Sequence, residues 1–132
     1  MMLMDTHIWL RWLLPENPLP QNIINLIDTT EYLAVSSISC WEVVLLVKQH
    51  RIELPLSVDE WLKEALEGSA VTALPITATI ASLAGILPYH HKDPADRFII
   101  ATAIHHDMKL VSFDGNFPSY IELNGILITE DL

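Results

Sequence analysis

The stretch from His90 to Ala103 reads HHKDPADRFIIATA, with charged residues at its start and apolar residues at its end. This pattern predicts a helix over residues 94–106. Asp93 suits the N-cap, and Pro94 suits the first helical position, where an N–H donor is not needed. The later residues leave almost no polar face, so we expect a buried helix. The helix dipole favours Asp96 in the first turn, but burying a carboxylate costs free energy unless a cation lies close to it.

Length and composition indicate a single globular domain over residues 1–132. The chain is 51% hydrophobic, which suits one packed core and excludes a disordered protein. Charges interrupt the apolar runs well short of a membrane span, and the N-terminal residues show no signal peptide, so we expect no membrane partner. The one cysteine, Cys40, excludes an internal disulfide and suits the reducing cytoplasm.

The net charge of −10 arises from seven Lys and Arg against seventeen Asp and Glu. Such a chain does not hold nucleic acid by broad neutralisation of phosphates, because that affinity grows with the number of cationic contacts. The charge is compatible with contact to phosphates through a metal ion and with a basic protein partner.

Short apolar segments alternate with helical segments along the whole chain. The expected strands cover residues 1–5, 33–36, 71–75, 109–112 and 125–128, and the last is expected at a sheet edge. The expected helices cover residues 6–14, 21–29, 58–67, 77–87 and 94–106, with another that is capped by Ser37 or Ser39 and ends near residue 50. This alternation predicts an α/β fold, a three-layer α/β/α sandwich around a central, mostly parallel sheet of four to five strands.

Four carboxylates fall where such a fold collects its functional residues. Sites in parallel sheets lie beyond the carboxyl ends of the strands. Asp5 ends the first expected strand, Asp114 follows the fourth, and Glu42 and Asp96 lie near the starts of helices. If strand ends and helix starts share one edge of the sheet, all four carboxylates converge there.

Each of these carboxylates also has a local explanation. Asp5 is a normal strand-end or N-cap residue, Glu42 completes a capping-box pattern with Ser39, and Asp114 forms a common turn pair with Gly115. The joint placement on one edge is what favours a shared site.

Crowded carboxylates repel one another unless some are protonated or a cation holds them. A set made of oxygen donors, without cysteine and without an obvious spacing of histidine ligands, favours Mg²⁺ or Mn²⁺ over Zn²⁺. Such ions polarise phosphates and activate water. The chemistry indicated is therefore metal-dependent hydrolysis of a nucleic-acid backbone.

Four sequence blocks resemble a PIN domain, and more narrowly the VapC-type toxins of type II toxin–antitoxin systems. The blocks are LMDTH at 3–7, SSISCWEV at 36–43, HKDPADRFIIATA at 91–103 and LVSFD at 110–114. They occur in the order typical of the family and span nearly the whole chain, and the third is the most specific.

The resemblance implies an Mg²⁺- or Mn²⁺-dependent endoribonuclease. The acidic set of the family, catalytic and metal-binding, corresponds here to Asp5, Glu42, Asp96 and Asp114. Further residues are candidates for a surrounding shell: Thr6, Asp93, Ser112 and Arg97. Among these we interpret Asp93 first as an N-cap and Arg97 first as a solvated helix residue, in preference to a phosphate contact. His90 and His91 are not needed as bases if a metal ion activates the water.

The resemblance also implies a cognate antitoxin that blocks the site, an RNA substrate and a homodimer. Apolar residues of two helices suggest a groove for the antitoxin: Ile8, Trp9, Trp12, Leu13, Trp41, Val44 and Leu45. The alternative, that these residues only pack against the sheet, stays open. Two other functions also stay open: a PIN-like nuclease outside toxin systems, and a catalytically silent module that binds a basic protein.

Overall fold

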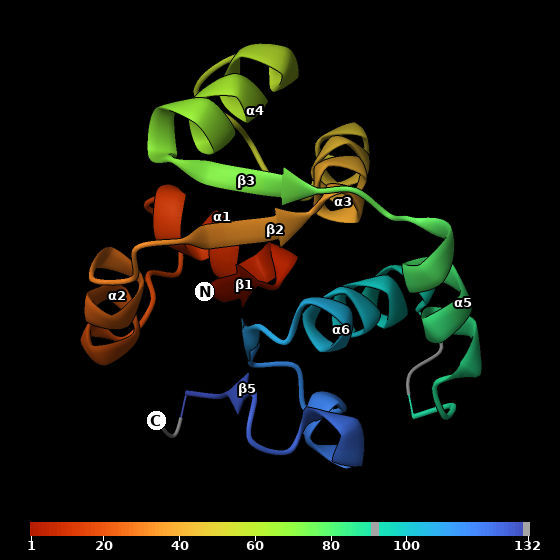
Figure 1. Cartoon of the computed structure of the whole chain (residues 1–132). Helices are drawn as coiled ribbons and strands as arrows, with labels where there is room; N and C mark the ends of the chain where they lie inside the picture. Colours follow the sequence, from red (N-terminus) through yellow and green to blue (C-terminus); the bar gives the residue numbers. More distant parts are fainter. Residues whose placement is uncertain (91–92, 131–132) are drawn as a thin grey trace.

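The computed structural model describes residues 1–90 and 93–130. Its centre is a sheet of five strands in the order β3-β2-β1-β4-β5, and every neighbouring pair is parallel. The strands are β1 (Met2–Met4), β2 (Leu33–Ser36), β3 (Val71–Leu74), β4 (Lys109–Val111) and β5 (Leu127–Ile128). The expectation of a mostly parallel sheet of four to five strands is thus confirmed at its upper limit. The arrows of β2 and β3 lie side by side and point the same way in Figure 1.

Helices fill the connections between the strands. They are α1 (Thr6–Leu13), α2 (Gln21–Asp28), α3 (Ser37–Lys48), α4 (Val58–Leu66), α5 (Ala78–Ile86) and α6 (Pro94–His106). Short 3-10 turns follow α4 and β4: η1 (Glu67–Ser69), η2 (Phe117–Ser119) and η3 (Ile121–Leu123). In the described part of the chain, no helix has both the length and the apolar character needed to cross a bilayer.

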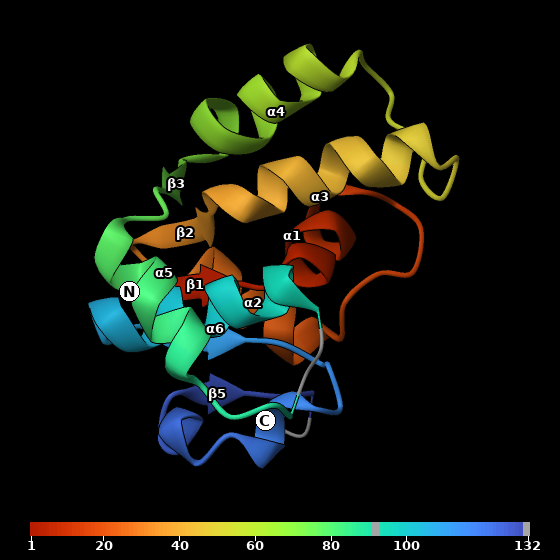
Figure 2. The same cartoon turned by 90° about the vertical axis from the view of Figure 1, so that its right-hand side faces the viewer.

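Alternating side chains of the strands build two cores, one on each face of the sheet. Met2 and Met4 pack with the helices α1, α2 and α4, whereas Leu3 packs with α5 and α6. Because successive residues of a strand point to opposite faces, a strand of three residues serves both layers. Figure 2 shows α3 lying alongside α4, beyond the sheet. The predicted three-layer sandwich is confirmed.

Local signals set most helix starts. Ser57 and Glu60 form the expected capping box, in which the Glu60 N–H donates to Ser57 Oγ and that hydroxyl donates to Glu60 Oε1. Asp93 caps α6 by accepting from the Ala95 N–H at 3.0 Å. The helix predicted before residue 50 is present as α3, but its predicted N-cap is wrong, because the cap is Ser36, the last residue of β2, rather than Ser37 or Ser39.

The tryptophans of the proposed antitoxin groove divide between core and surface. Trp9 has no exposed surface, its Nε1 donates to the Ala65 carbonyl, and its ring packs against Trp61, so its inclusion in a groove was wrong. Ile8 is also fully buried. Trp12 is half-buried, and Trp41 is 53% exposed on α3.

Arg97 does not occupy a solvated helix face. It is 8% exposed, and its guanidinium donates to the carbonyls of Ala84, Leu87 and Pro88 at 2.7, 2.7 and 2.9 Å. The guanidinium also lies over the Tyr89 ring, 4.7 Å from its centroid. The interpretation of Arg97 as a solvated helix residue is therefore wrong, because its donors serve the end of α5.

Candidate active site

Asp5 lies at the carboxyl end of β1, buried to 2% exposure and held from several sides. The Thr6 N–H and the Ser112 hydroxyl each donate to its carboxylate at 2.7 Å, and His7 Nδ1 lies 3.4 Å from Oδ2. Burial raises the pKa of Asp5 above its ordinary value, although the His7 imidazole and these hydrogen bonds act in the opposite direction. Asp5 is thus both the N-cap of α1 and a fixed acidic group at the edge of the sheet.

Glu42 meets the same edge from the second turn of α3. The Thr6 hydroxyl lies 2.5 Å from Glu42 Oε1 and 2.7 Å from the Ser39 hydroxyl. Because Thr6 has a single hydroxyl proton, it donates to the carboxylate and accepts from Ser39. Burial raises the pKa of Glu42, and the charges of Asp5 and Asp93 raise it further. The predicted capping box of Ser39 and Glu42 is wrong, because both residues bind Thr6 from within the helix.

The first turn of α6 adds two carboxylates to Glu42. One oxygen each of Glu42, Asp93 and Asp96 lies within 4.8 Å of the others. Asp93 therefore combines its N-cap hydrogen bond with a place in the acidic cluster, which the sequence interpretation ranked second. Asp96 is 9% exposed.

Asp114 is linked to Asp5 through Ser112 and is not one of the three carboxylates of this cluster. Its carboxylate accepts from the Asn116 N–H at 2.8 Å, and its own N–H donates to Ser112 Oγ at 3.1 Å. The turn expected for Asp114 is therefore present. Its charge contributes to the raised pKa of Asp5, which places both carboxylates at one edge. Ser112 joins the two residues through its single hydroxyl.

The donor set suits a hard divalent cation. Two full charges 4.8 Å apart repel by roughly 3.5 kcal/mol at the effective dielectric constant of a protein surface. A cation that accepts several carboxylate oxygens turns this repulsion into binding energy, and Mg²⁺ and Mn²⁺ prefer such ligands. Among the residues that the structure describes, this cluster contains no cysteine or histidine ligand that would favour zinc.

His7 is a site residue that the sequence analysis did not select. The Phe113 N–H donates to His7 Nε2 at 3.1 Å, so the Nδ1 atom carries the proton and faces Asp5. Its position two residues after Asp5, in the first turn of α1, is a usable sequence signal. His90 lies elsewhere, edge-on to the Tyr120 ring at 4.9 Å, and His91 and Lys92 lie outside the described residues.

Comparisons with known proteins agree in both sequence and fold. A family profile described as PIN domain matches residues 2–123. Ribonuclease VapC22 of Mycobacterium tuberculosis (strain ATCC 25618 / H37Rv) is 36% identical over 119 residues, which cover 89% of this chain and 90% of that protein.

Solved structures share the fold over nearly the whole chain. FitAcB from Neisseria gonorrhoeae superposes with a TM-score of 0.68 at 20% identity. A toxin–antitoxin complex from Klebsiella pneumoniae gives 0.67 at 22% identity. VapBC2 from Rickettsia felis, bound to a DNA fragment from its promoter, gives 0.68 at 20% identity. Each comparison covers 98% of this chain and 98% of the other.

Proposed function

The chain belongs to the PIN domain family, and on this premise we propose that it is a toxin ribonuclease that hydrolyses RNA phosphodiester bonds at the acidic edge of its sheet. The observation that carries the proposal is the approach of the Glu42, Asp93 and Asp96 oxygens within 4.8 Å of one another. A carboxylate cluster at the carboxyl ends of parallel strands is where this fold places its chemistry. The relative named Ribonuclease VapC22 supports the reaction class.

We propose Asp5, Glu42, Asp96 and Asp114 as the catalytic and metal-binding residues, with Asp93 beside them. When bound, Mg²⁺ or Mn²⁺ would polarise the phosphate and activate the attacking water. In the reaction, the water oxygen adds to phosphorus and one P–O ester bond breaks, so that one product keeps the phosphate and the other gains a hydroxyl group.

The surrounding side chains keep the acidic groups in place. Thr6 fixes Glu42 through its hydroxyl, and Ser112 fixes Asp5 through its own. His7 Nδ1 faces Asp5, with its ring held by the Phe113 N–H. Groups held in this way need little reorganisation when substrate binds, which is the main route by which an enzyme site stabilises developing charge.

We also propose an antitoxin partner, a homodimer and a cytoplasmic location. A structural neighbour named as a toxin–antitoxin complex supports the antitoxin. The surface left for a groove is formed by Trp12, Trp41 and Leu45, and the exposed Trp41 lies next to Glu42 in sequence. A basic side chain inserted among the carboxylates would block the site by charge. Light scattering of the purified chain tests the dimer.

The decisive experiment compares Asp96→Asn with Asp107→Asn. Both substitutions replace an acid by its amide on or next to α6, but Asp107 follows its last turn and is exposed. We expect Asp96→Asn to weaken Mn²⁺ binding, measured by calorimetry, by about 10–100-fold or more. RNA cleavage and growth arrest on expression should be lost with it, whereas Asp107→Asn should match the unmodified protein. Equal Mn²⁺ affinity and equal cleavage in the two variants would reject the proposed site.

A further inference from the structure

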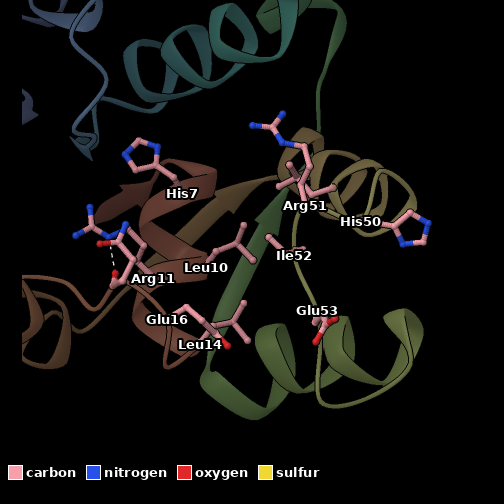
Figure 3. A pocket seen from close by; sticks show the side chains of 11 residues that line it. His7, Leu10, Arg11, Leu14, Glu16, His50, Arg51, Ile52 and Glu53 are labelled. Atoms are coloured by element: carbon pink, nitrogen blue, oxygen red, sulfur yellow. Dashed lines mark hydrogen bonds between the residues drawn. The ribbon is translucent and has the colours of Figure 1, made fainter.

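A pocket of about 570 Å³ opens between α1 and the segment that follows α3. Figure 3 shows Leu10 and Ile52 at its centre, with His7 and Arg51 on one rim and Glu16 and Glu53 on the opposite side. The pocket therefore has an apolar floor between a basic rim and an acidic rim.

The basic rim connects this pocket to the acidic site. His7 lines the pocket and also lies 3.4 Å from Asp5 Oδ2, so one imidazole forms a wall of both. The pocket and the acidic edge at Asp5 are therefore adjacent.

Arg51 is the cation of this rim that is available to a ligand. It is exposed, and no hydrogen bond or ion pair ties its guanidinium to any residue within 1–90 or 93–130. Arg11, in contrast, donates to the carbonyls of Asn17 and Pro18 at 2.7 and 3.1 Å and lies over Phe113. Arg11 is thus fixed in the wall, whereas Arg51 has all of its donors free.

The backbone beneath Arg51 is fixed by the end of α3. The His50 N–H donates to the Val47 carbonyl and the Arg51 N–H donates to the Leu46 carbonyl, at 3.0 and 2.9 Å. With His50 in the left-handed region at a φ of 57°, these bonds form a Schellman motif. The guanidinium therefore extends from a defined turn rather than from a loose loop.

We propose that this pocket holds a nucleotide of single-stranded RNA next to the scissile phosphate, with its base on the apolar floor and its phosphate on Arg51. The inference rests on the proposed ribonuclease function and names a subsite for its substrate. In a chain with a net charge of −10, a polyanion approaches only where a cation is available, and the free guanidinium of Arg51 is such a group on the rim that leads to the carboxylates. Proteins hold unstacked bases against apolar side chains or Arg guanidinium planes and by hydrogen bonds to the base edges.

The acidic rim sets the direction of the RNA. Glu16 and Glu53 repel phosphates, so the backbone follows the rim of His7 and Arg51 while the base points across the floor toward the two glutamates. Carboxylates accept hydrogen bonds from exocyclic amino groups, which adenine, cytosine and guanine carry and uracil lacks.

The test measures RNA affinity against salt concentration by fluorescence anisotropy. The probe is a single-stranded 12-nucleotide RNA of mixed sequence, and every variant carries Asp96→Asn to prevent cleavage. Arg51→Ala should weaken binding and reduce the slope of log affinity against log salt by about 0.7, the loss of one phosphate contact. Lys63→Ala, which removes the same charge from an exposed position on α4, should leave both quantities unchanged. Ile52→Ser should weaken binding severalfold without changing the slope, because a base on an apolar floor releases no counterions.

The outcomes separate this inference from the proposed function. If Arg51→Ala binds RNA as Lys63→Ala does, the subsite is wrong, whether or not the variant binds a partner protein less well. The ribonuclease function survives that result as long as the protein without substitutions cleaves RNA with Mn²⁺. If that protein binds RNA through Arg51 but does not cleave it, the ribonuclease proposal fails and the RNA pocket remains.

Discussion

Arg97 replaces a hydrogen bond that the sequence removes from α5. The carbonyl of Ala84 would normally accept from the N–H four residues later, but that residue is Pro88, which has none. The guanidinium of Arg97 supplies the missing donor at 2.7 Å and also binds the carbonyls of Leu87 and Pro88. Its positive charge lies at a helix C-terminus, where the helix dipole favours a cation. We therefore predict that Arg97 is needed for stability and not for catalysis.

The structure gives the size of the effect expected for Arg97→Met. Methionine keeps much of the apolar contact but leaves the buried carbonyls of Ala84 and Leu87 without this donor. Each unsatisfied buried carbonyl costs about 1–3 kcal/mol, so the free energy of unfolding should fall by roughly 2–6 kcal/mol. Arg97→Lys should lose less, because the ammonium keeps the charge but lacks the planar fork that reaches several carbonyls together.

Urea unfolding followed by circular dichroism measures this loss, and Mn²⁺ calorimetry on the folded variant tests the site. We expect the order of stability to be arginine, lysine, methionine, with Mn²⁺ affinity of the folded variants close to that of the unmodified protein. An unfolding free energy of Arg97→Met within about 1 kcal/mol of the original would refute the capping role. Loss of RNA cleavage at unchanged stability would instead favour a phosphate contact.

Three further predictions follow from backbone geometry and pKa values. Gly125→Ala should lower the free energy of unfolding by about 1–2 kcal/mol because φ is +83°, whereas Gly115→Ala, with equally open surroundings and no positive φ, should be near neutral in the same urea titration. In EDTA the free energy of unfolding should rise as the pH falls from 7 toward 3.8 and 4.5, the ordinary pKa values of Asp and Glu, because the raised pKa values of Asp5 and Glu42 make the folded state bind more protons than the unfolded state. Glu42→Gln should flatten this pH dependence of the free energy of unfolding. An unchanged profile in that variant would contradict a raised pKa for Glu42. Burial raises the pKa of Cys40, so its thiol should react with a disulfide reagent at pH 7 more slowly than in the urea-unfolded chain.

The parts of the fold that could be predicted from the sequence depend on local chemistry. Ser57 with Glu60 and Asp93 with Pro94 each satisfy their own helix start, so their roles are readable from a few residues. Ser39 is not the N-cap of α3 because the helix begins directly after β2, and Ser36, the last residue of that strand, occupies the cap position.

The candidate site was predictable where topology alone brings residues together. Parallel strands place Asp5 and the residues after β4 at one edge, as expected. The N-cap role of Asp93 is enough to explain this residue in the sequence, so its place in the acidic cluster is easily overlooked. A carboxylate has two oxygens, and Asp93 can therefore cap α6 and also contribute to the cluster. His7 depends on the Phe113 N–H, a contact over 106 residues that no local pattern contains.

The largest errors concern residues whose partners come from packing between helices. The sequence of α6 alone suggests a solvated Arg97. Its acceptors are carbonyls at the end of α5, which lack a helical partner because Pro88 ends that helix. The sequence suggests a groove that includes Trp9 because the two helices carry more apolar side chains than packing against the sheet requires. The ring of Trp61 and the carbonyl of Ala65, both from α4, cover Trp9 instead.

The central place of β1 in the sheet has a consequence for the assembly of the site. Asp5 directly follows β1, yet the hydroxyl that fixes it comes from Ser112, 107 residues later. Until β4 and the residue after it dock beside β1, the Asp5 carboxylate lacks this hydrogen bond and the acidic site is not assembled. A chain that lacks residue 112 is therefore expected to have no assembled acidic site.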